Sequence, residues 1–298
     1  MKRRKFLSKA TVASTAFLFG PSVFFNKAKA DPMSRIGLTT VVFRNEFAST
    51  NPDLNTSVLT LQDIPEYFSE RFGIHNVEYW SEHFESREKS YLKELKKALE
   101  KKNCTLINIQ ADTPGKDISN PENGNSALAI QEIKEWIDAG KFLGAKMVRA
   151  SFMHKSFEEG MKSMKTLADY ARNQGIILLA ENHFDLLSIP GNHLKVAKAY
   201  NGEYFGLLAD FGNYSDDVDR YEALKLIAPY TKLVSAKTHA FDEDYNHTSF
   251  DFDKCIRIME EGGFRGIYSL EQWESGVLDY DFEKIVDWMI EHVSANIS

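Results

Sequence analysis

Four apolar segments of the chain each end in a residue that could bind a metal ion. The segments span residues 176–181, 206–210, 233–239 and 266–271, and they end in Glu181, Asp210, His239 and Glu271. These four residues are 29, 29 and 32 positions apart. A single acidic residue after an apolar segment is usually a solvated loop residue or a helix cap, but four at a regular spacing favour a shared site. Two glutamates, one aspartate and one histidine suit Mn, Mg, Co or Zn, so we predict one bound divalent metal ion.

The spacing of these residues also predicts the fold that positions them. A (β/α)8 barrel uses about 31 residues for each strand–helix unit and keeps its active site at the carboxyl ends of the strands. Short strand-like segments alternate with amphipathic helical ones along the chain. Strands are predicted at 36–43, 74–79, 105–110, 146–152, 176–181, 206–210, 233–239 and 266–271. Helices are predicted at 61–72, 87–102, 126–142, 157–173, 191–199, 218–226, 252–261 and 281–292. We therefore expect a single α/β domain, a (β/α)8 TIM barrel, over residues 31–298.

The first thirty residues have the pattern of a signal peptide. A basic start that contains Arg3 and Arg4 precedes an uncharged run over residues 10–25, and Ala28 and Ala30 form an A-x-A cleavage site. The arginine pair resembles the twin-arginine export signal. An uncleaved anchor is the alternative, but the run is shorter than a membrane span and is interrupted by polar residues, Gly and Pro. We expect cleavage before Asp31, a periplasmic location and no stable membrane anchor afterwards.

Net charge excludes one class of partner. The chain has 36 Lys and Arg against 43 Asp and Glu, and seven of the basic residues lie in residues 1–30. Without that segment, 29 bases face 43 acids, a net charge of about −14. A phosphate backbone would be repelled by such a protein, so nucleic acid is not an expected partner.

Four short motifs resemble the xylose isomerase-like TIM barrels, a superfamily of sugar isomerases and sugar 3-epimerases. They are Glu181-Asn182-His183, Asp210-Phe211-Gly212-Asn213, Ala236-Lys237-Thr238-His239 and Ser269-Leu270-Glu271, and the resemblance covers residues 35–298. It implies that Glu181, Asp210, His239 and Glu271 hold one divalent ion. It also implies that Glu181 and Glu271 are the acid–base pair. Asn213 departs from the pattern, because many epimerases have histidine at that position.

Six further residues are candidates for contact with substrate. They are His183, Asn213, Lys237, Trp273, Arg149 and Glu78, all at or just after the carboxyl ends of predicted strands. Lys237 lies two residues before His239, so both should face the same side of the strand. The alternative for Lys237 is a structural lysine beside a carboxylate. Trp273 could stack on a sugar face or pack under a loop.

Three functions remain open at this point. The first is a divalent-metal-dependent sugar isomerase or epimerase that removes a proton α to a carbonyl group and passes through an enediolate. The second is a lyase or hydrolase of 3-keto-glycosides that uses the same residues for elimination. The third is a non-catalytic sugar-binding barrel, which would have no need of two opposed carboxylates. The expected partner is a small sugar or glycoside, and a homo-oligomer is possible.

Overall fold

The computed structural model describes residues 31–150, 152–200, 202–274 and 280–297. Its strands are β1 (Ile36–Thr39), β2 (Asn76–Trp80), β3 (Thr105–Gln110), β4 (Met147–Arg149), β5 (Ile177–Glu181), β6 (Phe205–Asp210), β7 (Thr231–Thr238) and β8 (Ile267–Gln272). Its α-helices are α1 (Ile64–Phe72), α2 (Lys89–Lys101), α3 (Asn125–Leu143), α4 (Phe157–Gln174), α5 (Pro190–Tyr200), α6 (Arg220–Ile227), α7 (Phe252–Glu261) and α8 (Phe282–Asn296). The predicted signal peptide lies outside the described residues.

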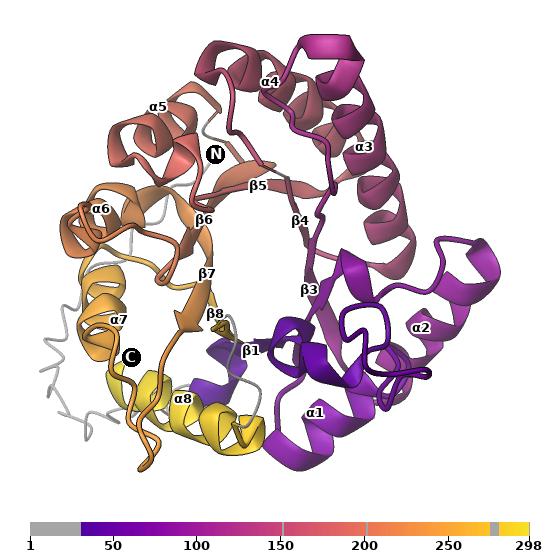
Figure 1. The fold of residues 1–298 in the computed structure, drawn as a ribbon, viewed down its shortest axis with the longest axis vertical. Coiled ribbons are helices and arrows are strands. Elements are labelled where there is room, and N and C mark those ends of the chain that lie inside the picture. Colours follow the sequence, from indigo (N-terminus) through magenta and orange to yellow (C-terminus); the bar gives the residue numbers. More distant parts are fainter. Residues whose placement is uncertain (1–30, 151, 201, 275–279, 298) are drawn as a thin grey trace, which may run out of the picture.

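The eight strands are all parallel and close into one barrel in the order β1 to β8 (Figure 1). The α-helices surround the barrel, and α8 lies beside α1, where the ring of helices closes. Arg71 on α1 fixes this closure through ion pairs of 2.6 Å to Glu283 and 2.7 Å to Asp287 on α8. The predicted (β/α)8 barrel is confirmed.

Apolar side chains fill the lower part of the barrel interior. Ile107, Met147, Leu179, Leu208 and Leu233 form one buried cluster there. A second, larger core lies between the strands and the surrounding helices. Side chains alternate between these two cores along each strand, as the pleat requires. We call this apolar interior layer the floor of the cavity. The polar residues at the carboxyl ends of the strands lie directly above it.

Short sequence signals fix where the helices begin and end. The carboxylates of Asp219, Asp251 and Asp281 accept hydrogen bonds from the first-turn N–H groups of α6, α7 and α8. Gly144 and Gly175 end α3 and α4 with φ of 83° and 74°, which glycine adopts without the steric cost that other residues meet. Each helix therefore stops where the chain must turn back into the next strand.

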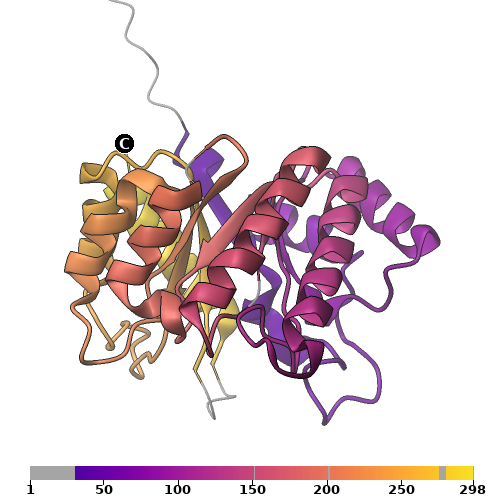
Figure 2. The same ribbon diagram turned by 90° about the horizontal axis from the view of Figure 1, so that it is seen from above.

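Three strand boundaries differ from the prediction in a way that affects the site. The strand predicted at 146–152 ends at Arg149. The strand predicted at 36–43 ends at Thr39, and a 3-10 helix over Thr40–Glu46 follows because the Thr39 hydroxyl accepts a hydrogen bond from Val41 N. The strand predicted to end at His239 ends at Thr238. His239 therefore begins the long loop after β7, at the end of the barrel opposite to the C-terminus (Figure 2).

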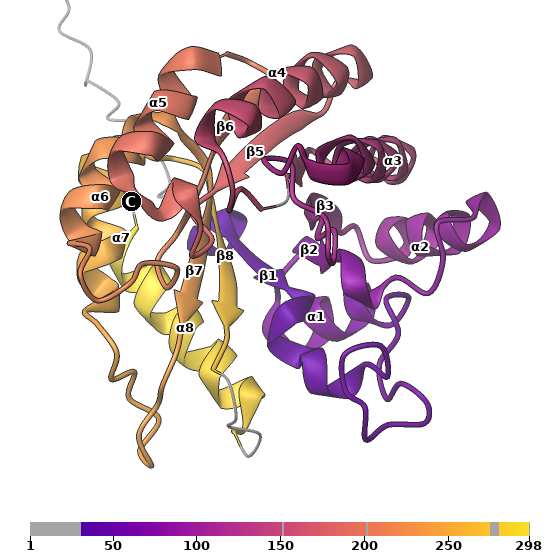
Figure 3. The ribbon, with the colours of Figure 1, turned by 45° about the horizontal axis from the view of Figure 1, so that its top comes forward.

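No α-helix in the described ranges is both long and apolar enough to cross a membrane. The carboxyl ends of β7 and β8 lie side by side at one end of the barrel (Figure 3). This is the end at which the predicted site residues gather.

Candidate active site

A cavity of about 200 Å³ opens at the carboxyl ends of the strands, and we call it the active-site cavity. It is lined by Val41, Trp80, Gln110, Asp112, Arg149, Glu181, His183, Phe184, Asn213, Lys237, Glu271 and Trp273. Both predicted acid–base residues, Glu181 and Glu271, are in this set. So are five of the six predicted substrate residues, all but Glu78. A cavity of this size is small among ligand sites, which suits a single sugar unit better than a long chain.

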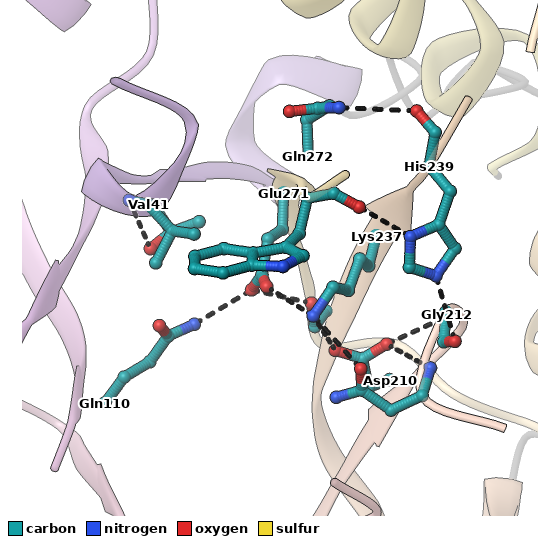
Figure 4. Close-up of polar contacts among 12 residues, drawn as sticks. Val41, Gln110, Asp210, Gly212, Lys237, His239, Glu271 and Gln272 are labelled. Carbon is teal, nitrogen blue, oxygen red and sulfur yellow. Dashed lines mark hydrogen bonds and ion pairs between the residues drawn. The ribbon is translucent and has the colours of Figure 1, made fainter. Parts of the chain in front are cut away.

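Glu271 is held from three sides at the end of β8. Its Oε1 lies 3.0 Å from Lys237 Nζ, and its Oε2 accepts hydrogen bonds from Gln110 (3.0 Å) and Ser235 (3.1 Å) (Figure 4). Burial alone would raise the pKa of Glu271, but the ammonium and these hydrogen bonds hold it below its usual value. The carboxylate is therefore both charged and fixed in orientation.

Glu181, at the end of β5, is bound to a second cation. Arg149 Nε lies 2.9 Å from Glu181 Oε2, and Arg149 Nη1 lies 2.5 Å from Asp112 Oδ1. Asp112 in turn accepts a hydrogen bond of 2.7 Å from the Trp80 indole N–H. Burial, and the charges of Asp210 and Glu271, raise the pKa of Glu181 well above its usual value despite Arg149. The two predicted acid–base residues thus lie in electrostatically different surroundings.

Asp210 lies below the cavity surface at the end of β6. Its Oδ1 accepts hydrogen bonds from the backbone N–H groups of Gly212 (2.7 Å) and Asn213 (3.0 Å), and its Oδ2 lies 3.9 Å from Lys237 Nζ. Burial raises the pKa of Asp210 to about 6, although Lys237 opposes the shift. The side chain is fully buried, so it acts on the cavity through the residues around it.

His239 does not line the active-site cavity, and it lies on a neighbouring pocket beside Gly212. Its Nδ1 lies 2.5 Å from the Trp273 carbonyl oxygen and its Nε2 lies 3.0 Å from the Gly212 carbonyl oxygen (Figure 4). Both ring nitrogens thus lie against backbone carbonyl oxygens, and a neutral imidazole can donate a hydrogen bond to only one of them. The residue that faces Glu271 across the β7–β8 pairing is Lys237.

The residues as arranged do not fit a four-ligand divalent ion. Asp210 Oδ2 is buried without a hydrogen-bond partner, which would favour a cation, whereas Glu181 Oε2 is already ion-paired with Arg149. However, both oxygens of Glu271 are occupied, and the Lys237 ammonium lies among the carboxylates. A divalent ion among these carboxylates would be repelled by that ammonium. Over the described parts of the chain, no three His, Cys, Asp or Glu residues are grouped to hold a metal ion. The predicted metal site is therefore not assembled here.

The other predicted substrate residues divide into two groups. His183, Asn213 and Trp273 line the cavity as predicted, and burial keeps the pKa of His183 well below its usual value, so that its ring is neutral. Glu78 instead lies one layer below. It accepts hydrogen bonds from Asn108 Nδ2 (2.6 Å) and from the Ser269 hydroxyl, and burial raises its pKa to about 7. Its side chain is fully buried, so it supports the floor of the cavity.

Sequence reasoning missed two cavity residues that hold the acid–base pair in place. Gln110 is the last residue of β3, and Asp112 follows two positions later. Gln110 contacts Glu271, and Asp112 reaches Glu181 through Arg149. The signal was available, because both residues follow the predicted strand 105–110 at its carboxyl end.

The sequence of residues 68–292 matches the model of a protein family described as the xylose isomerase-like TIM barrel. The chain belongs to this family. None of the curated proteins matches the sequence. The predicted resemblance is therefore confirmed at the level of the family.

Solved structures of xylose isomerase-like TIM barrels and of sugar epimerases share the fold. A D-allulose 3-epimerase from Methylomonas sp. is 12% identical, with a TM-score of 0.61 over 87% of this chain and 94% of that one. A 3-keto-D-glucoside 4-epimerase from E. coli is 13% identical, with a TM-score of 0.62 over 86% and 98%. A xylose isomerase-like TIM barrel protein from Mycobacterium smegmatis in complex with magnesium is 15% identical, with a TM-score of 0.65 over 89% and 98%.

Proposed function

We propose that the protein is a sugar isomerase or epimerase that transfers a proton at a carbon atom next to a carbonyl group. The observation that supports this most directly is that two buried carboxylates, Glu181 and Glu271, line one small cavity. They come from β5 and β8, three places apart in the closed barrel, so they approach the cavity from different sides. Sugar epimerases among the structures of similar fold support the same reaction class.

The proposed reaction needs one carboxylate to accept a proton and the other to return one. One of the two removes the proton from the carbon next to the carbonyl group. The electron pair of the C–H bond forms a C=C bond, and the carbonyl π pair moves to oxygen, which gives an enediolate. The second residue, in its acid form, returns a proton to the opposite face, and exchange with water restores both groups. The product is an epimer of the substrate.

The charges in the cavity favour a neutral sugar over a sugar phosphate. Among the described residues that line it, the cationic side chains are Arg149 and Lys237, and both are ion-paired with carboxylates. A phosphate group would compete with Asp112, Glu181 and Glu271 for these cations. We therefore expect free keto-sugars or keto-glycosides as substrates.

A second function is favoured by the mouth of the cavity. Trp273 and Phe184 are 36% and 55% exposed there, and Phe184 has a φ of 52°, which is uncommon for a bulky residue. These rings could hold the second group of a 3-keto-glycoside. Removal of the α-proton would then expel the glycosidic oxygen, which would take its proton from the acid residue.

Product analysis by NMR distinguishes these functions. The purified protein is incubated with free ketoses and with 3-keto-glycosides. A new epimer or aldose signal supports the isomerase, and an alkene proton together with the released alcohol supports the lyase. Saturable binding of these sugars without any product on the whole panel would contradict both and favour a binding protein.

A further inference from the structure

The inner face of β7 ends in a lysine at the level where the proton would be transferred. Leu233 lies in the apolar floor, Ser235 donates a hydrogen bond to Glu271, and Lys237 follows on the same face. The strand pairing sets Lys237 directly beside Glu271. The position of this cation is therefore fixed by the backbone register as well as by the side-chain rotamer.

Three oxygen atoms surround the Lys237 ammonium group. Its Nζ lies 3.0 Å from Glu271 Oε1, 3.0 Å from Asn213 Oδ1 and 3.9 Å from Asp210 Oδ2 (Figure 4). An ammonium group has three N–H donors, and 3.9 Å is too long for a hydrogen bond. Two donors are therefore used within the protein, and the third is available to an oxygen atom in the cavity that Lys237 lines.

We propose that the Lys237 ammonium stabilises the enediolate oxygen, in the role and place of a divalent metal ion, so that the protein works without a bound metal. The inference rests on the proposed function. When Glu271 takes the α-proton, its negative charge disappears and a negative charge develops on the substrate oxygen. The ammonium lies beside Glu271 and lines the cavity, so it neutralises the charge before and after the transfer. Lys237 keeps its three protons throughout, and no metal is consumed or required.

The orientation of His239 is a second, independent observation that agrees with this role. The predicted fourth ligand lies beyond the end of β7, with both ring nitrogens directed at backbone carbonyl groups. A Cβ atom at Gly212 would come within 2.6 Å of His239 Nε2 and 3.0 Å of Lys237 Cδ, so the backbone of Gly212 packs closely against both side chains. The fold thus places the Lys237 ammonium, and not the His239 imidazole, at the active-site cavity.

The test combines a metal titration with solvent exchange. The chelator-treated protein is titrated with Mn²⁺ and followed by electron paramagnetic resonance. Incorporation of deuterium from D₂O into keto-sugars is then measured with EDTA present, for the unmodified protein, Lys237→Met and Lys232→Met. Lys232 is the matched control, because it lies on the same strand outside the active-site cavity and its ammonium donates a hydrogen bond to the Glu203 carbonyl oxygen (3.2 Å). Circular dichroism shows whether each variant is folded. If Lys237→Met does not fold, Lys237→Arg, which keeps the positive charge, is measured in its place.

We expect that Mn²⁺ does not bind stoichiometrically and that EDTA does not reduce the rate of deuterium exchange. In Lys237→Met the exchange rate should fall by about 10²- to 10³-fold, the usual cost of removing one oxyanion donor. Lys232→Met should keep full exchange, and Lys237→Arg should lose less than Lys237→Met. One tightly bound Mn²⁺ per chain that disappears in Asp210→Asn, or exchange that requires added metal, would overturn the inference while leaving the proposed function standing. Absence of exchange on every sugar, with or without Mn²⁺, would instead overturn the proposed function and this role of Lys237 with it.

Discussion

Lys237 and Glu271 form a buried ion pair across β7 and β8, with Nζ and Oε1 3.0 Å apart and each residue about as buried as the apolar core. Such a pair contributes little net stability, because the desolvation of both charges offsets their attraction. Removing one partner is different, because it leaves the other charge buried and unpaired. A substitution of either residue should therefore change both the stability of the barrel and the reaction in its cavity.

The first prediction concerns the stability of this pair. Lys237→Met should lower the free energy of unfolding by about 3–5 kcal/mol, because Glu271 loses its counter-ion inside the barrel. The double variant Lys237→Met, Glu271→Met should regain most of that loss, since the unpaired charge of Glu271 is removed as well. Urea denaturation followed by circular dichroism measures both. If the double variant is as unstable as the sum of the two single variants, the two residues are not energetically coupled.

The second prediction concerns Arg149, which bridges Glu181 and Asp112. Arg149→Lys keeps the positive charge but loses the forked group that reaches both carboxylates. We expect kcat/KM to fall by about 10²-fold, as for a small displacement of a reacting group. Arg172→Lys on the surface of α4 is the control and should change nothing. Full activity in Arg149→Lys would show that the bridge does not position Glu181.

The third prediction concerns acid stability. His193 is buried, and its Nε2 lies 3.0 Å from the Ala180 carbonyl oxygen. Burial lowers its pKa to about 4, against an ordinary value of about 6.5 in the unfolded chain. The unfolded state therefore binds more protons between these values. The stability that neutral His193 contributes is present above about pH 6.5 and is lost as the pH falls toward 4, by up to roughly 3 kcal/mol.

Denaturation of the unmodified protein and of His193→Gln, measured from pH 4 to pH 7, isolates this effect. Other titrating groups are common to both proteins, so they cancel in the difference. The stability gap between the two should narrow by about 1.4 kcal/mol for each pH unit below 6. A gap that stays constant over this range would mean that His193 is not protonated preferentially in the unfolded state.

The fourth prediction concerns export, which we propose from residues 1–30 of the sequence. A reporter fused to this segment should reach the periplasm, and the Arg3→Lys, Arg4→Lys double variant should stay in the cytoplasm. Mass spectrometry of the exported protein should find Asp31 at the new N-terminus. Export of the double variant at the normal rate would exclude the twin-arginine route.

The regular alternation of strands and helices made the barrel predictable from the sequence. The register between neighbouring strands was not predictable in this way. Spacing along the chain set His239 level with Glu271, because all four predicted ligands were placed at the ends of their strands. In the structure Lys237 pairs with Glu271, so His239 lies two residues beyond that level. An irregularity between β6 and β7, where Leu207 pairs with Thr231 and Leu208 pairs with Leu233, also alters which residues lie side by side. Register depends on pairing between distant segments, and residue spacing does not contain it.

The depth of a residue within the barrel could not be predicted from the sequence either. Glu78 and Glu181 both lie near the ends of apolar strands, yet Glu78 is one layer deeper and bound to Asn108 and Ser269. Gln110, an uncharged residue at a strand end, lies in the cavity beside Glu271. The tilt and stagger of a closed barrel decide which strand end reaches the cavity. Residue type together with position at a strand end identified Glu181 and Glu271, because both are acidic and both reach the cavity.

The central claim is that Glu181 and Glu271 transfer the proton next to a substrate carbonyl group, and solvent exchange tests it most directly. A keto-sugar that the protein converts is incubated in D₂O with the unmodified protein, Glu181→Gln, Glu271→Gln and the control Glu260→Gln, whose carboxylate pairs with Arg35 away from the cavity. NMR should find deuterium at the α-carbon with the unmodified protein and the control, and rates about 10²- to 10⁴-fold lower for the two cavity variants. Undiminished incorporation by both cavity variants would contradict the account.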